Sequence, residues 1–75
     1  MQTVGERLRW ARMRKVWTLD DLAEHAGVMK ATLSRIENGR QEARQSTIRK
    51  LAAVLDVDPA WLLMGDDLDL GKADA

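Results

Sequence analysis

Residues 18–39 read TLDDLAEHAGVMKATLSRIENG, and the fold depends on this stretch. Thr18 stands at an N-cap position, and two aspartates follow in the first turn, where the helix dipole favours negative charge. Gly27 follows the last residue of that helix, where a left-handed backbone ends a helix without a β-carbon clash. A second helix is predicted over residues 30–37, and the Asn-Gly pair at 38–39 ends it. The spacing predicts two short helices joined by a tight turn.

A longer helix is predicted before this pair, over residues 3–15. It has two apolar stripes, which are Val4, Leu8 and Ala11 on one face and Trp10, Met13 and Trp17 on the second. Two stripes imply two packing partners.

Two helices are predicted after the pair. An eight-residue connection, residues 40–47, leads into a helix whose apolar residues repeat at i, i+3, i+4 and i+7, namely Ile48, Leu51, Ala52 and Leu55. Asp58 and Pro59 then suit the N-cap and first position of a short helix that Gly65 closes. No segment alternates as a half-buried strand does, so an all-α fold of five helices is predicted.

The charge of the chain is unevenly distributed although its formal net charge is zero. Residues 1–50 hold eleven Lys or Arg against six Asp or Glu, whereas residues 51–75 hold one against six. A basic half of this kind can face phosphates, because acidic groups beyond a Debye length of about 8 Å are screened. An ordinary mixed surface is the alternative.

Several classes of function find no support in the residues. Cysteine is absent, His25 is the single histidine, and no Gly-rich phosphate loop occurs, so no metal, no cofactor and no enzyme activity is expected. We expect His25 to lie on the surface. No apolar run approaches about 18 residues and the N-terminus has no apolar signal region, so we expect a soluble, cytoplasmic protein without membrane contact.

The outer face of the second helix of the pair suits a DNA groove. With Leu33 and Ile36 turned inward, the outward side chains are Lys30, Ala31, Thr32, Ser34 and Arg35. Lys and Arg donate to guanine O6 and N7, and an alanine can contact a thymine methyl. The alternative for each of these residues is a solvated surface position.

The stretch RLRWARMRKVWTLDDLAEHAGVMKATLSRIENGR, continued by STIRKLAAVLDVDPAWLL, resembles the Xre-type helix-turn-helix family, which includes the lambda-type phage repressors and Cro. The resemblance covers about residues 4–65, and its most specific parts are T-x-x-x-L-A-x-x-x-G-V (18–28) and S-R-I-E-N-G (34–39). It implies a compact five-helix, lambda-repressor-like DNA-binding domain over residues 1–65. Residues 66–75 would be a short acidic tail that contributes to dimer contacts.

The resemblance also implies roles for individual residues. The base-contacting set on the recognition helix, at about residues 29–37, would be Met29, Lys30, Ala31 and Arg35. The phosphate-binding set would be Thr18, Thr32, Asn38, Arg40, Arg44 and Thr47. Arg12 and Glu37 would form an ion pair that ties the first helix to the end of the recognition helix.

Three residues depart from the family pattern. Leu19 replaces a common Gln after the capping Thr, so a phosphate or base contact is missing. Met29 stands where Ser or Thr often caps the recognition helix, and it cannot accept the first N–H groups. Val16 stands where relatives commonly have Gly, so we expect a less sharply turned first connection.

Apolar residues near the C-terminus predict a homodimer. The candidate interface residues are Trp61, Leu63, Met64 and Leu68, and the alternative is that Trp10 and Trp61 pack the last helix on the first. The predicted function is a transcriptional regulator, a repressor that binds an inverted-repeat operator in double-stranded DNA. The alternative is an antitoxin-like or other protein-interaction module whose main partner is a protein, such as a toxin or an activator, and whose DNA binding is secondary.

Overall fold

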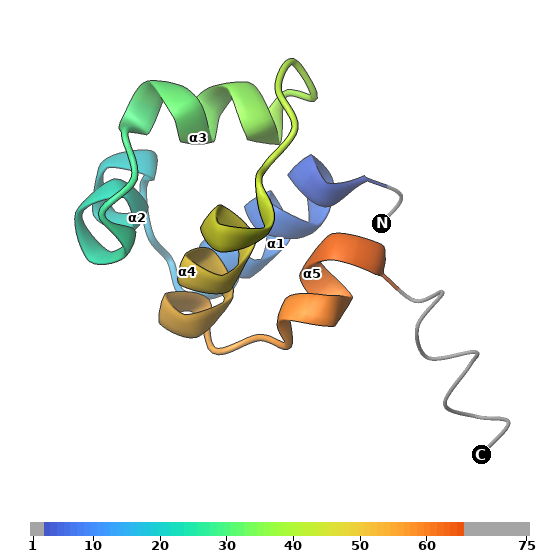
Figure 1. Ribbon diagram of the computed structural model, residues 1–75. Coiled ribbons are helices and arrows are strands. Elements are labelled where there is room, and N and C mark those ends of the chain that lie inside the picture. Colours follow the sequence, from blue (N-terminus) through green and yellow to red (C-terminus); the bar gives the residue numbers. More distant parts are fainter. Residues whose placement is uncertain (1–2, 66–75) are drawn as a thin grey trace, which may run out of the picture.

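Five helices form the structure of this chain, a computed structural model that describes residues 3–65 (Figure 1). They are α1 (Val4–Arg14), α2 (Leu19–Ala26), α3 (Lys30–Glu37), α4 (Gln45–Leu55) and α5 (Pro59–Met64). Figure 1 shows α3 along one edge of the molecule, with α1, α4 and α5 on the opposite side. Residues 3–65 contain no strand, so the all-α prediction is confirmed.

The helix ends lie close to where the local signals place them. Thr18 caps α2, and its hydroxyl accepts a hydrogen bond from the backbone N–H of Asp21. Gly27 ends α2 in the left-handed conformation, with φ of 68°. Asp58 caps α5 by accepting from the N–H of Ala60 at 2.8 Å, and Pro59 is the first residue of that helix. These predictions are confirmed.

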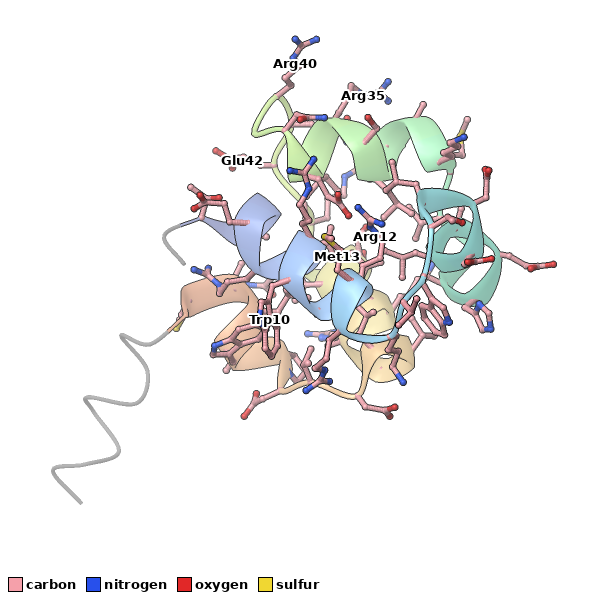
Figure 2. All side chains as sticks on the ribbon, turned by 180° about the vertical axis from the view of Figure 1, so that it is seen from behind. Trp10, Arg12, Met13, Arg35, Arg40 and Glu42 are labelled. Carbon is pink, nitrogen blue, oxygen red and sulfur yellow. The ribbon has the colours of Figure 1, made fainter. Side chains whose placement is uncertain are left out.

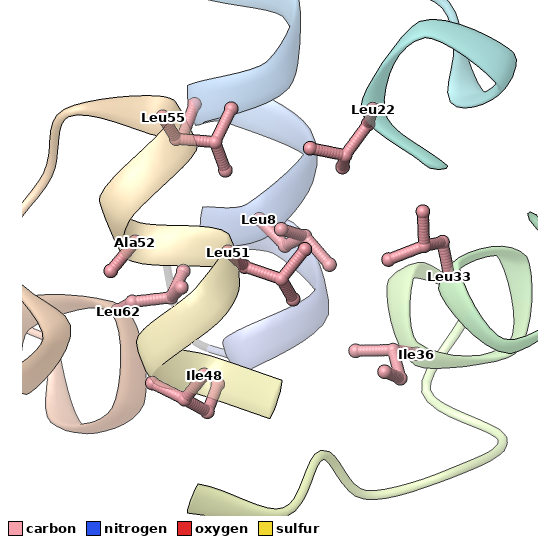
Figure 3. Packing of buried hydrophobic residues seen from close by; sticks show 10 residues of the cluster. Leu8, Leu22, Leu33, Ile36, Ile48, Leu51, Ala52, Leu55 and Leu62 are labelled. Carbon is pink, nitrogen blue, oxygen red and sulfur yellow. The ribbon is translucent and has the colours of Figure 1, made fainter. Parts of the chain in front are cut away.

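The core is made of buried side chains from all five helices (Figure 3). They are Leu8 and Ala11 of α1, Leu22 of α2, Leu33 and Ile36 of α3, Ile48, Leu51, Ala52 and Leu55 of α4, and Leu62 of α5. Full burial of one Leu or Ile side chain is worth roughly 1.5–3 kcal/mol. The inner face of α3 is therefore fixed against the other helices, and its opposite face is left outside.

A buried arginine joins α1 to α5. Arg7 donates from Nε to the carbonyl oxygen of Leu62 at 2.9 Å and from a terminal nitrogen to that of Leu63 at 2.8 Å. The last carbonyls of a helix have no partner within the helix, and a cation is favoured there. Arg7 thus stabilises the end of α5, a role that the sequence did not predict.

Helix α4 begins earlier than predicted. Arg44 is its N-cap and Gln45 its first residue, so the connection after α3 is shorter than residues 40–47. The apolar repeat begins only at Ile48, and the first turn is polar and carries no side-chain cap. Periodicity alone could not detect this turn.

The expectation for Val16 is wrong, because the first connection is tightly turned. Val16 has φ of 59°, and its side chain is 87% exposed. The backbone N–H of Trp17 donates to the carbonyl of Arg12 at 3.2 Å, which closes the turn. A β-branched residue in the left-handed region is strained by about 1–2 kcal/mol. The chain carries this strain at a position where members of the resembled family commonly have Gly.

We expect Val16→Gly to raise the free energy of unfolding by about 0.5–1 kcal/mol, because relief of strain exceeds the added entropy of the unfolded chain. The exposed side chain has little packing to lose. Urea unfolding of the full chain measures the change. Val16→Ala is the control, since it keeps a β-carbon and should change stability less. Equal stability of the two variants would contradict the account of strain.

Within residues 3–65, no helix combines the length and apolar character that crossing a membrane requires.

Candidate nucleic-acid interface

The outer face of α3 is exposed over its whole length. Leu33 and Ile36 are buried in the core, and the four predicted base-contacting residues, Met29, Lys30, Ala31 and Arg35, are all exposed. Thr32 and Ser34 are half-buried at the edges of this face. Arg35 and Arg40 project from α3 and the loop after it, away from the body of the molecule (Figure 2). The structure therefore leaves all four predicted base-contacting residues accessible, with Met29 and Lys30 at the start of α3 and Ala31 and Arg35 on the face opposite Leu33 and Ile36.

The first turn of α3 is electropositive. Its N-cap is Met29, which is 73% exposed and makes no side-chain cap hydrogen bond. No acidic residue lies in this turn, and Lys30 is its first residue. Free N–H groups, the positive end of the helix dipole and a cation together favour an anionic partner.

Helix α4 begins in the same way. Arg44 is its N-cap without a side-chain hydrogen bond, and its first turn holds no acid. By contrast, the side chains of Thr3, Thr18 and Asp58 cap α1, α2 and α5. Among the described helices, the two without a side-chain cap are thus α3 and α4, which both start beside predicted DNA contacts.

Three of the predicted phosphate-binding residues surround one hollow. Thr32 of α3 and Arg44 and Thr47 at the start of α4 line a space of about 200 Å³ together with Gln41 and Glu42. Two hydroxyls and a guanidinium around one hollow can donate to a phosphate oxygen. Glu42 opposes this with a negative charge at its rim.

The other two predicted phosphate contacts near α3 lie beyond this hollow. Asn38 is the C-cap of α3, and its side-chain amide donates to the carbonyl of Ser34 at 2.8 Å. Arg40 is exposed on the loop that follows. Asn38 therefore serves the helix end, whereas Arg40 is directed into solvent.

Thr18 lies in a more acidic place than the other predicted phosphate contacts. Its hydroxyl accepts from Asp21 N at 3.1 Å, and its backbone N–H donates to the Asp21 carboxylate at 2.9 Å. Asp20 adds a second carboxylate in the same turn. A phosphate approaching the start of α2 therefore meets two negative charges, so the hydroxyl of Thr18 acts first as a cap.

The capping box lowers the pKa of the Asp21 carboxyl below its ordinary value, through the backbone N–H of Thr18 first and its hydroxyl second. The carboxylate therefore stabilises the fold above the ordinary pKa near 3.9, and this contribution disappears as the pH falls through the lowered pKa. We expect an NMR titration of the Asp21 carboxyl to show the lowered pKa. In Thr18→Val, which keeps the N–H, the pKa should rise part of the way back. An unchanged pKa in that variant would exclude a role for the hydroxyl.

Arg12 and Glu37 tie α1 to the last turn of α3. Arg12 Nε and a terminal nitrogen donate to the two Glu37 oxygens at 2.7 and 2.9 Å, and another nitrogen donates to the carbonyl of Trp17 at 2.8 Å. The side chains are 12% and 2% exposed. The hydrogen bond to Glu37 raises the pKa of Arg12, against the effect of burial. The backbones of α1 and α3 also approach closely at Gly5, as shown by the clash that a β-carbon there would make with the carbonyl oxygens of Ile36 and Glu37.

We expect Glu37→Gln to lower the free energy of unfolding by roughly 3–5 kcal/mol, because it leaves a largely buried guanidinium without its counter-charge. Urea unfolding measures this loss. The matched control is Arg9→Gln, since Arg9 contacts the same carboxylate at 3.5 Å from an exposed position. Removing that contact should cost less than about 1 kcal/mol. A Glu37→Gln loss as small as that of Arg9→Gln would contradict the role given to the buried pair.

Two residues of this face were not found from the sequence. Gln41 accepts a hydrogen bond from Arg35 Nε at 2.8 Å, and Asp20 forms an ion pair with Lys30 at 3.2 Å. Both contacts join separate elements, α3 to its following loop and α3 to α2. No short-range pattern signals such pairs.

The candidate dimer residues lie on and beside α5. Trp61 packs edge-on against Trp10 with ring centroids 5.6 Å apart, which is the contact that the alternative predicts. Even so, Trp10 stays 43% exposed and Met64 54% exposed. Leu63 and Met64 line a shallow apolar space of about 160 Å³ beside Ile48. Leu68 lies outside the described residues, as does the rest of the predicted tail.

His25 lies on the surface, as predicted. Its ring stacks on Trp17 with centroids 4.2 Å apart, and its Nδ1 contacts the carbonyl oxygen of Asp21 at 2.8 Å. Within the part of the chain that the structure describes, no group of three side chains is arranged to hold a metal.

The chain matches a helix-turn-helix family and is similar to proteins named as transcriptional regulators. The sequence model of a family described as "Helix-turn-helix domain" matches residues 3–62. The uncharacterized HTH-type transcriptional regulator RghRB of Bacillus subtilis (strain 168) is 43% identical over 58 residues, which are 76% of this chain and 42% of RghRB. This chain spans about half or less of the length of the first such relatives.

Two solved structures have closely similar folds. The P22 c2 repressor protein, in complex with a synthetic operator, has a TM-score of 0.82 at 29% identity over 88% of this chain and 100% of that chain. A chain of the SinR protein/SinI protein complex has a TM-score of 0.79 at 40% identity over 83% of this chain and 61% of that chain. The repressor-like fold implied by the resemblance is thereby confirmed.

Proposed function

We propose that this chain, which belongs to the helix-turn-helix domain family, is a transcriptional regulator that binds a specific sequence of duplex DNA. The observation that carries the proposal is the burial of Leu33 and Ile36, which leaves the opposite face of α3 exposed. In a helix-turn-helix the second helix enters the major groove, about 12 Å wide, and contacts base edges there. Its likeness to a repressor solved with an operator supports the same use of α3 here.

Arg35 is the principal base contact in this proposal. Its Nε donates to Gln41, and within residues 3–65 its terminal nitrogens make no hydrogen bond. A guanidinium held at Nε presents its other edge in a fixed direction, which suits O6 and N7 of a guanine. Met29, Lys30 and Ala31 at the start of α3 contact the neighbouring base pairs.

The phosphate contacts fix the position of α3. Thr32, Arg44 and Thr47 bind one phosphate at the hollow between α3 and α4, where the uncapped first turn of α4 adds N–H donors. Asn38 and Arg40 bind the backbone near the end of α3. Thr18 contributes through the start of α2, where the acidic residues weaken its contact.

We further propose that the protein acts as a homodimeric repressor in the cytoplasm, on an inverted repeat. Trp61, Leu63 and Met64 offer the apolar surface for the second copy, with Leu68 beyond the described part. A two-fold axis near α5 would relate two recognition helices, which must lie about 34 Å apart to enter successive major grooves.

A protein-interaction module is the second candidate function. The likeness to a chain of the SinR protein/SinI protein complex favours it, because that structure pairs a similar domain with another protein. Leu19 and Met29 replace residues that are polar in the resembled family, which removes a DNA contact at Leu19 and a helix cap at Met29. In this case a protein such as a toxin or an activator would be the main partner.

Selection from a random duplex library tests the first candidate and yields the operator. We expect Arg35→Ala to weaken binding to the selected operator by about 1–3 kcal/mol and to relax sequence preference, because a base contact is lost. Arg44→Ala should weaken all duplexes alike and reduce the salt slope by about 1, because a phosphate contact is lost. Binding is measured by fluorescence anisotropy over a salt series.

Lys15→Ala is the control for these two variants. Lys15 is a cation that pairs with Asp56 where α4 ends, far along the chain from α3. It should leave operator binding unchanged. Equal operator binding by the wild type and Arg35→Ala would refute the role of α3, and absence of any enriched sequence would favour the protein-interaction module.

A further inference from the structure

An ion pair links the first turns of the two helices of the motif. Lys30 Nζ lies 3.2 Å from one carboxylate oxygen of Asp20 and 3.3 Å from the other. Lys30 is the first residue of α3, and Asp20 is the second residue of α2. The side chains are 56% and 74% exposed, so solvent reaches both.

This pair contributes little to stability. Exposed ion pairs contribute little to folding because water and salt screen them. Lys30 is also unfavourably placed within its own helix, since a cation opposes the dipole at an N-terminus. Asp20 offsets that unfavourable position, and it does so on the face proposed to meet DNA.

The neighbouring carboxylate has a different role. Asp21 is engaged in the capping box, where it accepts the backbone N–H of Thr18 at 2.9 Å. Asp20 is the acid of this turn that contacts Lys30. Any movement of Lys30 toward a phosphate therefore either breaks the pair or brings a carboxylate close to the DNA backbone.

We propose that Asp20 is a specificity-determining residue that lowers the affinity of this protein for arbitrary DNA. Non-specific binding depends on cations that neutralise phosphates, so a paired Lys30 contributes less to it and Asp20 adds repulsion. In the operator complex Lys30 is directed to a base edge, where α3 is held in register by its other contacts. Asp20 thus reduces non-specific affinity more than operator affinity. This inference rests on the DNA binding proposed above.

The test uses the full 75-residue chain and two probes, a duplex pool of random sequence and the duplex enriched by selection. We expect Asp20→Asn to bind the random pool about tenfold more tightly, with a salt slope steeper by about 0.9, because Lys30 becomes free for one more phosphate. Affinity for the enriched duplex should change less, so the ratio of the two affinities falls. A thermal midpoint near that of the wild type shows that the variant is folded.

Two further variants separate this role from a general effect of charge. Glu24→Gln makes the same change of charge one turn further along α2, at an exposed position, and should increase non-specific affinity much less. In the Lys30→Ala background, Asp20→Asn should increase non-specific affinity only as much as Glu24→Gln does, because Asp20 acts mainly through Lys30.

Equal gains in non-specific affinity from Asp20→Asn and Glu24→Gln would overturn the inference, and so would a full gain in the Lys30→Ala background. A wild type that shows no preference for any enriched duplex would instead refute the proposed function itself. The two failures are therefore distinguishable in one series of measurements.

Discussion

The ion pair between Arg12 and Glu37 ties α1 to the last turn of α3. It joins the two helices through two hydrogen bonds of 2.7 and 2.9 Å, and both side chains are almost covered. Gly5 allows the backbone of α1 to approach the end of α3 without a β-carbon between them. A buried charge pair has strict geometry, because each charge loses its hydration and needs its partner. These contacts hold the C-terminal end of α3 against α1, while the outer face of α3 stays at the surface.

The electrostatic design of the surface follows from where the helices begin and end. The uncapped first turns of α3 and α4 carry Lys30 and Arg44, whereas Asp56 and Asp58 lie at the far end of α4. Helix α4 has 11 residues and at 1.5 Å per residue is about 16 Å long, so Arg44 at its start and Asp56 at its end lie about that far apart. This distance exceeds the Debye length of about 8 Å at physiological salt. Arg44 is therefore screened from the acidic groups at the end of α4, although the chain has zero net charge.

The cations of the recognition helix attract phosphates, but each of them is already held by a partner in the free protein. Arg35 is held by Gln41, and Lys30 is held by Asp20, so two cations of the recognition helix have defined partners before any ligand arrives. Ordering a long side chain in advance lowers the entropy lost on binding. It also limits the freedom of these cations to contact phosphates at random. Specific recognition needs both properties, because every duplex carries the same phosphates.

The sequence by itself determined the five helices, most of their ends and the inner face of α3. Thr18, Gly27, Asp58 and Pro59 act within one turn of their own positions, and the spacing of Leu33 and Ile36 selects the buried face, so these features are local. The resemblance to a family added the pair of Arg12 and Glu37, whose partners are 25 residues apart. Only the tertiary structure decided the left-handed turn at Val16, the polar first turn of α4, and the contacts Arg7–Leu62, Lys30–Asp20, Arg35–Gln41 and Trp10–Trp61. The contacts depend on how separate elements are placed in space, and Val16 takes a strained backbone in the short connection between α1 and α2, which both pack on α3.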